Sequence, residues 1–176
     1  MATPQTAAPA ASQLPAGDWH VVPADSELGF ETRIMFGLIP VHGRYSAYAG
    51  ELHADAAGDA SGSLYIDAAT VRTGIKKRDN HLRSRDYFAV EEHPHLRFEL
   101  SSLAPDAAGS QTVSGTLFIR GREIRIETPI SLELAGPDRL RLSADFEVDH
   151  SHAGLGWKKV PDAVDVHAAL ALERMS

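Results

Sequence analysis

The residues best suited to chemistry lie in one short basic connection of an otherwise acidic chain. Five cations stand there: Lys76, Lys77, Arg78, Arg83 and Arg85. Arginine binds phosphate and carboxylate groups through paired hydrogen bonds, so this cluster could hold an anionic head group. We expect Arg78 and Arg83 to make such contacts. The alternative, more usual for a charge run, is that Arg78 and Asp79 fix the connection while the lysines are solvated.

A second candidate site contains two histidines near the C-terminus. His150 and His152 would face the same way on a strand and could share a metal. No third ligand has suitable spacing, and Gly154 and Gly156 indicate a loop, so we predict no metal site. We expect His150 at the rim of a pore, hydrogen-bonded to a ligand head or a backbone carbonyl. Trp157 could be a lid over one mouth or a packed apolar cap.

Catalysis has little support in the sequence. The chain has no Cys, which excludes disulfides, thiolate metal sites and a cysteine nucleophile. It also has no G-x-S-x-G elbow, phosphate-binding glycine loop or dinucleotide fingerprint. Asp79 and His81 would point in different directions on a helix and make a poor dyad. We therefore expect no enzyme and no cofactor. The alternative, an isomerase or hydratase acting on a lipid, needs a titrating group inside the fold.

Strand periodicity dominates the chain after residue 18. Apolar and polar residues alternate, as in antiparallel strands with one dry and one wet face. We predict about eight strands, at residues 28–34, 43–53, 61–67, 96–100, 112–120, 123–134, 140–148 and 164–172. Eight strands joined by short turns favour closure into a barrel.

Local signals add detail to this barrel. The turn at residues 120–122 should close a tight hairpin. Tyr45 and Tyr48 are three residues apart, which predicts a bulge in the second strand. Only residues 75–86 look helical, with Ile75 and Leu82 on one face.

The interior of an eight-stranded barrel is either filled by side chains or open to one small ligand. The inward positions here are uncharged and include small residues such as Ala144 and Ala168, so an apolar guest would suit them. Trp19 should pack across a closed base. We predict a pore lined by Phe30, Ile34, Phe36, Leu38, Tyr45, Tyr48, Leu64, Ile66, Phe88, Leu96, Phe98, Leu117, Ile126, Leu142, Phe146, Val166 and Leu170.

Composition limits the remaining choices. The chain of 176 residues has a net charge of −7, which argues for one folded domain and against nucleic-acid binding. We predict a flexible Ala/Pro-rich tail at residues 1–17 and a barrel domain at 18–176. The tail lacks the charged and apolar regions of a secretory signal, and no run has transmembrane length. We therefore expect a soluble, cytoplasmic protein, with a periplasmic or secreted one as the alternative.

Several motifs carry a family resemblance: TGI at 73–75, RDNHLRS at 78–84, DYF at 86–88, PHLRFE at 94–99 and GTLFIRG at 115–121. Together, over about residues 19–172, they resemble the YceI-like family of bacterial polyisoprenoid-binding, lipocalin-like proteins. The family often has His where this chain has Asp25, which puts a head-group role there in doubt.

The resemblance implies a fold and a function. The expected fold is all-β: a single antiparallel, eight-stranded, lipocalin-like barrel with a short helical insert around residues 75–86. Its elongated pore would hold a polyisoprenoid or quinone-like lipid, with the head group near the mouth at Arg78, Arg83, His150 and Trp157. The expected function is non-catalytic binding or carriage of that lipid. Relatives commonly pair, so a homodimer is an open alternative, as is an interaction module with a filled barrel.

Overall fold

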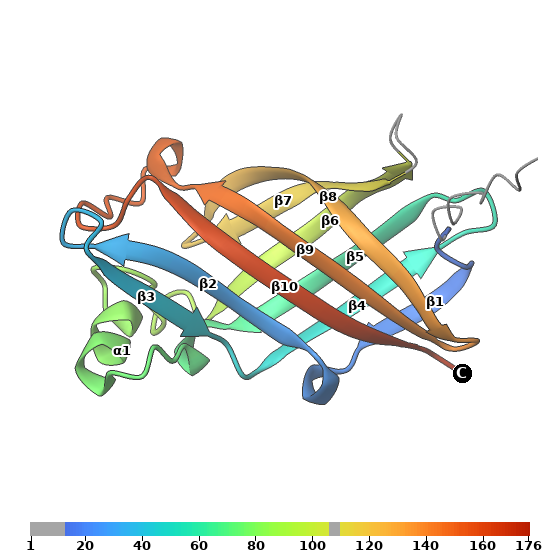
Figure 1. The fold of residues 1–176 in the computed structure, drawn as a ribbon, viewed down its shortest axis with the longest axis horizontal. Helices are drawn as coiled ribbons and strands as arrows, with labels where there is room; N and C mark the ends of the chain where they lie inside the picture. The colour runs from blue at the N-terminus through green and yellow to red at the C-terminus, as the bar shows by residue number, and fades with distance from the viewer. Residues whose placement is uncertain (1–12, 106–109) are drawn as a thin grey trace, which may run out of the picture.

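The computed structural model describes residues 13–105 and 110–176, which form one continuous antiparallel sheet of ten strands (Figure 1). In chain order the strands are β1 (Gly17–Val21), β2 (Glu27–Ile34), β3 (Ile39–Arg44), β4 (Tyr48–Ala54), β5 (Ala60–Asp67), β6 (His95–Pro105), β7 (Gln111–Ile119), β8 (Arg122–Gly136), β9 (Arg139–Asp149) and β10 (Ala163–Arg174). The helices of this part of the chain are α1 (Lys76–Arg83) and three short 3₁₀ helices at Pro23–Asp25, Ala68–Thr70 and Ser151–Ala153.

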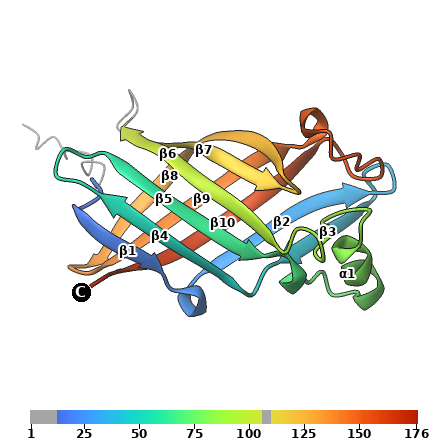
Figure 2. The ribbon, with the colours of Figure 1, turned by 180° about the vertical axis from the view of Figure 1, so that it is seen from behind.

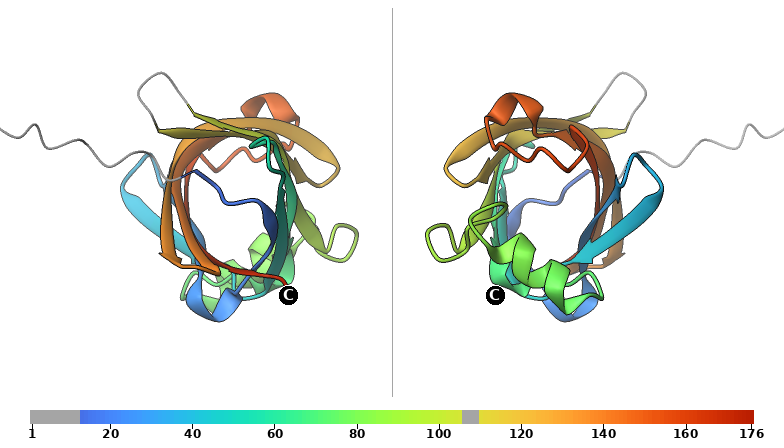
Figure 3. Two further views of the ribbon diagram at one scale, coloured as in Figure 1. Left: turned by 90° about the vertical axis from the view of Figure 1, so that its right-hand side faces the viewer. Right: turned by 90° about the vertical axis from the view of Figure 1, so that its left-hand side faces the viewer.

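Eight of the strands close into a barrel. The order β1-β4-β5-β6-β7-β8-β9-β10 returns to its start because β1 also pairs with β10, from Trp19 opposite Arg174 to Val21 opposite Leu172. Figure 3 shows the ring from both ends. The predicted antiparallel eight-stranded barrel is therefore confirmed, and closure of the ring removes the sheet edges that an open sheet would have. Its strands differ in one place from those predicted: the predicted strand at residues 28–34 is β2, which lies outside the ring, and β1 completes the ring instead.

The remaining two strands form a hairpin at one end of the barrel. β2 pairs with β10 at residues 165–169, beyond the part that pairs with β1, and β3 lies outside β2. Arg44 at the end of β3 forms an isolated bridge with Arg72, just before α1. Figures 1 and 2 show that this hairpin, α1 and the loop between β9 and β10 all gather at the same end, which we call the mouth.

The alternation of the sequence matches the observed burial. In β8, Ile124, Ile126 and Ile130 are buried, and their neighbours in the strand between them are mostly exposed. β7 and β8 are joined by a two-residue turn in which Arg120 and Gly121 both have positive φ, at 52° and 71°. This geometry matches the right-handed twist of the flanking strands and confirms the predicted tight hairpin.

The predicted strand at residues 43–53, with its bulge, is corrected by the structure. The chain breaks there into β3 and β4, and the break has a long-range cause. The backbone N–H groups of Ser46 and Ala47 donate to the hydroxyl of Thr70 rather than to a neighbouring strand. The sheet instead has irregular register between Leu100 and Ser102 and between Leu134 and Gly136.

The helical insert is shorter than predicted. α1 covers Lys76–Arg83, and Ser84 ends it by donating its hydroxyl to the carbonyl of His81. The predicted apolar face is only half right: Ile75 is 53% exposed, whereas Leu82 packs against the core. The buried residue of the helix is Asp79, whose role is described below.

The end opposite the mouth is filled by side chains. Trp19 and Leu140 have no exposed surface there, and the guanidinium of Arg174 lies 4.6 Å from the centre of the Trp19 ring. The Trp19 indole donates to the carbonyl of Pro15, and Leu14 packs against the core. The described part of the predicted tail is therefore in contact with the barrel, and residues 1–12 of that tail lie outside the described residues.

Two further observations complete the fold. The sequence PDAAG at residues 105–109 predicts a turn, but it falls mainly on residues 106–109, which lie outside the described residues. Of the helices in the described chain, none has the length and apolarity needed to cross a lipid bilayer.

Candidate functional site

The barrel encloses a cavity of about 860 Å³ that reaches the mouth. Its wall consists of inward residues from the strands, together with α1, the β2–β3 turn and the loop after β9. The predicted residues that border it are Phe30, Ile34, Phe36, Tyr45, Leu64, Ile66, Phe88, Leu96, Phe98, Leu117, Ile126, Leu142, Phe146, Val166 and Leu170, with Arg78, His150 and Trp157 from the predicted rim.

Three predicted residues do not belong to this wall. Leu38 is 79% exposed because it lies in the β2–β3 turn and points to solvent. Tyr48 is buried in the core, where burial and then the nearby Glu27 carboxylate raise the pKa of its phenol. Arg83 binds backbone groups beneath α1 instead of facing the cavity.

The wall carries little charge. Among the described residues, its charged members are Arg33, Glu51, Arg78, Lys158 and Lys159. All are exposed except Arg78, which is half-buried. Because an unpaired charge inside an apolar cavity is costly, such an interior suits an uncharged guest, with any charged group held at the mouth.

A row of aromatic rings, which we call the aromatic collar, lies in the cavity wall near the mouth. The ring centres of Phe30 and Tyr45 are 6.0 Å apart, those of Tyr45 and Phe88 6.2 Å, and those of Phe88 and Trp157 5.6 Å. Tyr87 lies 6.0 Å from Trp157 on the other side. These separations are typical of favourable tilted and edge-to-face pairs, so the collar is a packed, ordered entrance.

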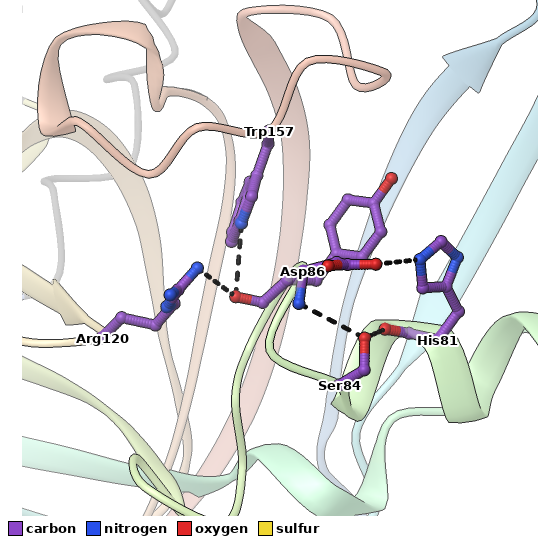
Figure 4. A network of polar contacts seen from close by, with 6 residues as sticks. His81, Ser84, Asp86, Arg120 and Trp157 are labelled. Carbon is purple, nitrogen blue, oxygen red and sulfur yellow. Dashed lines mark hydrogen bonds and ion pairs between the residues drawn. The ribbon is translucent and has the colours of Figure 1, made fainter.

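The carbonyl of Tyr87 holds three segments of the mouth together (Figure 4). It accepts a hydrogen bond from Arg120 Nη1 at 3.1 Å, in the β7–β8 turn, and one from the Trp157 indole at 3.3 Å. Beside it, His81 Nε2 lies 2.8 Å from the Asp86 carboxylate, and the His81 ring packs edge-on against the Tyr87 ring. Trp157 is thus anchored, in agreement with the packed cap more than with a free lid.

The arginines of the insert mainly hold the insert in place. Buried Asp79 accepts from the backbone N–H of Thr73 at 2.8 Å and from its hydroxyl at 2.6 Å. Arg78 donates to the same hydroxyl and to the Thr73 carbonyl. Arg83 donates to the carbonyls of Ala69 and Val71 and to the Asn80 side chain. These contacts agree with the alternative prediction for the basic cluster, in which Arg78 and Asp79 fix the connection in place.

His150 also has a structural partner. It is buried at the end of β9, and its Nε2 lies 2.6 Å from the Pro161 carbonyl, to which the nitrogen must donate because a carbonyl only accepts. The strand ends at Asp149, so exposed His152 does not share its face. No cluster of His, Asp and Glu among the described residues could hold a metal ion.

Comparison with known proteins places this geometry in a family. The YceI-like domain matches residues 19–172. The chain belongs to the YceI-like family. Among curated proteins, a UPF0312 protein of Ectopseudomonas mendocina is 29% identical over 83 residues, which cover 46% of this chain and 44% of that protein. The match therefore spans less than half the length of this curated relative.

Solved structures with the same fold come from several bacteria. BcnA of Burkholderia cenocepacia superposes with a TM-score of 0.76 at 23% identity, covering 86% of this YceI-like chain and 98% of that one. A polyisoprenoid-binding domain of Saccharophagus degradans, implicated in plant cell wall breakdown, gives a TM-score of 0.71 at 18% identity, covering 89% and 98%. At these identities, the likeness supports the barrel fold.

Sequence reasoning missed several members of the YceI-like wall. Thr32 borders the cavity, and its buried hydroxyl oxygen has no hydrogen-bond partner among the described residues. Tyr87 and His81 border it too, although no periodic pattern marks them. The alternation of β2 could have identified Thr32, because it shares the parity of Phe30. Burial also raises the pKa of Tyr45 far above its usual range, so this phenol stays neutral.

Proposed function

We propose that the protein is a non-catalytic carrier of a long apolar lipid, a polyisoprenoid or a quinone-like molecule, held in the barrel. The observation that carries the proposal is the 860 Å³ cavity with its uncharged interior. Cavities of about 300–1,000 Å³ with apolar walls and a few polar groups are typical of sites for small hydrophobic ligands. The polyisoprenoid-binding domain of Saccharophagus degradans, which has a similar fold, supports the same ligand class.

The dimensions of the barrel suit a chain-like guest. β9 has 11 residues, so it is about 36 Å long, and a strand tilt of about 40° leaves roughly 28 Å along the barrel axis. A guest that enters tail first would place its polar head at the mouth. There, the neutral hydroxyls of Tyr45 and Thr32 offer hydrogen bonds to a carbonyl or hydroxyl head group.

The polar groups at the mouth favour an uncharged head over a phosphate. Arg83 is occupied by backbone carbonyls, and two nitrogens of Arg78 donate to Thr73. Of the two arginines predicted to contact an anion, Arg78 and Arg83, only Arg78 borders the cavity. Arg78 alone therefore stays a candidate for such a contact. A carrier is better supported than an enzyme acting on the lipid, because the histidines that border the cavity among the described residues have partners within the protein: His150 Nε2 donates to the Pro161 carbonyl, and His81 Nε2 lies 2.8 Å from the Asp86 carboxylate.

Organic extraction of the purified protein, followed by mass spectrometry, tests the proposal. We expect a bound lipid with a long apolar tail. Ala144→Phe should reduce its amount because Ala144 is buried and borders the cavity, whereas Ser143→Phe, at the exposed next position of β9, should leave it unchanged. An empty wild-type protein that also fails to bind added prenyl alcohols would exclude the carrier function.

The cytoplasm stays the predicted compartment, and a homodimer stays the predicted alternative to a monomer. Cell fractionation and sedimentation analysis test these two predictions independently of the ligand.

A further inference from the structure

The β2–β3 turn presents a set of large apolar side chains to solvent. Phe36 has an exposed fraction of 105%, Leu38 of 79% and Met35 of 62%, and Ile39 is 43% exposed at the start of β3. A soluble surface usually shows such residues singly, so four within five positions indicate a surface that contacts something apolar.

The backbone of this turn holds those side chains outward at a conformational cost. Met35 and Phe36 have φ of 55° and 57°, a region that costs a non-glycine residue on the order of 1 kcal/mol. The turn is nevertheless fixed: Leu38 N–H donates to the Met35 carbonyl, and Arg33 Nη1 donates to the Gly37 carbonyl. Strain at a defined apolar tip indicates a functional contact more than packing, because its large side chains are mainly exposed.

Cations gather around the same tip. The segments that form the mouth, residues 33–39, 74–88 and 150–162, contain eight Lys and Arg against three Asp, although the whole chain has 17 against 24. Lys158 and Lys159 border the mouth beside Arg33, and none of the three forms an ion pair with another described residue. Figure 1 shows the turn, α1 and this loop at the same end.

We propose that this end of the protein docks on the surface of an anionic lipid bilayer, with the β2–β3 turn inserted among the head groups and the mouth facing the membrane. The apolar tip supplies the inserted area, and the surrounding cations match the negative surface potential of anionic lipids. A second copy of this chain fits the same surface poorly, since a two-fold contact would bring the two cationic rims face to face.

The docking site and the cavity share one opening. Phe36, Met35 and Lys158 belong both to the exposed surface and to the cavity wall. An apolar guest could therefore pass between bilayer and barrel without crossing water. The docking itself does not depend on the guest, because it uses the outer face of the mouth.

Flotation of the full chain with vesicles tests the docking. We expect binding to vesicles of equal parts phosphatidylcholine and phosphatidylglycerol, and much weaker binding to phosphatidylcholine alone. The vesicles contain no isoprenoid, so the result is separate from that of the extraction experiment. Added salt should weaken the binding, because the cations act through exposed charges.

Two variants distinguish the tip from the charges. Phe36→Asn should lower partition into the anionic vesicles on the order of tenfold, because a large apolar side chain no longer leaves water. Asn tolerates positive φ, so this variant should fold at least as well as the wild type. Lys158→Gln with Lys159→Gln should lower partition severalfold and flatten the salt dependence.

Leu134→Asn is the matched control, because Leu134 is 46% exposed near the closed end of the barrel. It should leave vesicle binding unchanged. Equal binding of the wild type and Phe36→Asn would overturn the proposal. So would a wild-type dimer that Phe36→Asn converts to a monomer without any vesicle binding, since the tip would then serve a second copy.

Discussion

Gly43 leaves room for the ring of Phe30, a residue of the cavity wall, and replacing Gly43 should push that ring into the path of the guest. Gly43 in β3 lies directly opposite Phe30 in β2, and the Phe30 ring covers the space where a side chain would stand. A Cβ at Gly43 would lie 2.2 Å from the nearest ring atom, and the three nearest heavy atoms all belong to that ring. In Gly43→Ala, the backbone can therefore stay in place while the ring moves off the strand.

The displaced ring can move into the barrel cavity, which Phe30 already borders. A cavity of about 150 Å³ holds one benzene ring, so the displaced ring would take up at most roughly a sixth of the 860 Å³, concentrated as a constriction. If the constriction excludes one isoprene unit, the loss is about 0.8 kcal/mol for each of its carbons, or roughly 3–4 kcal/mol. This corresponds to an increase in Kd on the order of a hundredfold.

Titration with prenyl alcohols of increasing length measures this effect. For Gly43→Ala, we expect affinity to stop rising at a shorter chain than for the wild type. The double variant Gly43→Ala with Phe30→Ala should recover the length dependence, because the ring that blocks the lumen is gone. Undiminished lipid binding by Gly43→Ala would refute the reasoning. A double variant that binds lipid as weakly as the single variant would show that the substitution had damaged the fold and not only narrowed the cavity.

Two further predictions concern stability. Burial raises the pKa of Tyr45, so its contribution is present below the unfolded pKa of about 10 and lost as pH rises above it. Between about pH 10 and 11, urea unfolding should show the wild type losing about 1 kcal/mol more than Tyr45→Phe, and equal losses would contradict the burial of this phenol. Arg83→Met should lower the free energy of unfolding by about 2 kcal/mol, because it removes bonds to Ala69, Val71 and Asn80. Lys77→Met, which removes a cation of α1 that has no such partner among the described residues, should change it by less than about 0.5 kcal/mol.

Much of the barrel could be predicted because a strand's side chains alternate with a fixed period of two. Once a strand such as β8 or β9 was located, the parity of Ile126 or Leu142 gave the inward face directly. β3 was not found, because Pro40 and Gly43 weaken its strand pattern and only Val41 and Gly43 are buried. The break before β4 depends on the hydroxyl of Thr70, more than twenty residues away, which no local pattern reveals.

The mouth was harder to predict than the wall, because its residues do not follow the alternation of a strand. Its residues come from connections without period, and long-range contacts fix their positions. Tyr87 faces the cavity because its carbonyl is bound by Arg120 and Trp157, which are 33 and 70 residues away in sequence. The basic cluster was misleading in another way: its arginines look available for anions in the sequence, yet Arg83 is used by carbonyls of the preceding loop.

The two ends of the barrel differ in a way that determines how a guest could move. At one end, Trp19 and Leu140 are completely buried and do not border the cavity, so side chains close the barrel there. At the other, the cavity opens between the aromatic collar and the apolar β2–β3 turn. A guest must then enter and leave by the same mouth, and its head group, which enters last, is the first part to leave. If the protein is the proposed carrier and docks as proposed, it would release its cargo where the mouth is docked, so the surface that recognises the destination has to lie at the opening, as the exposed Phe36 and Lys158 do.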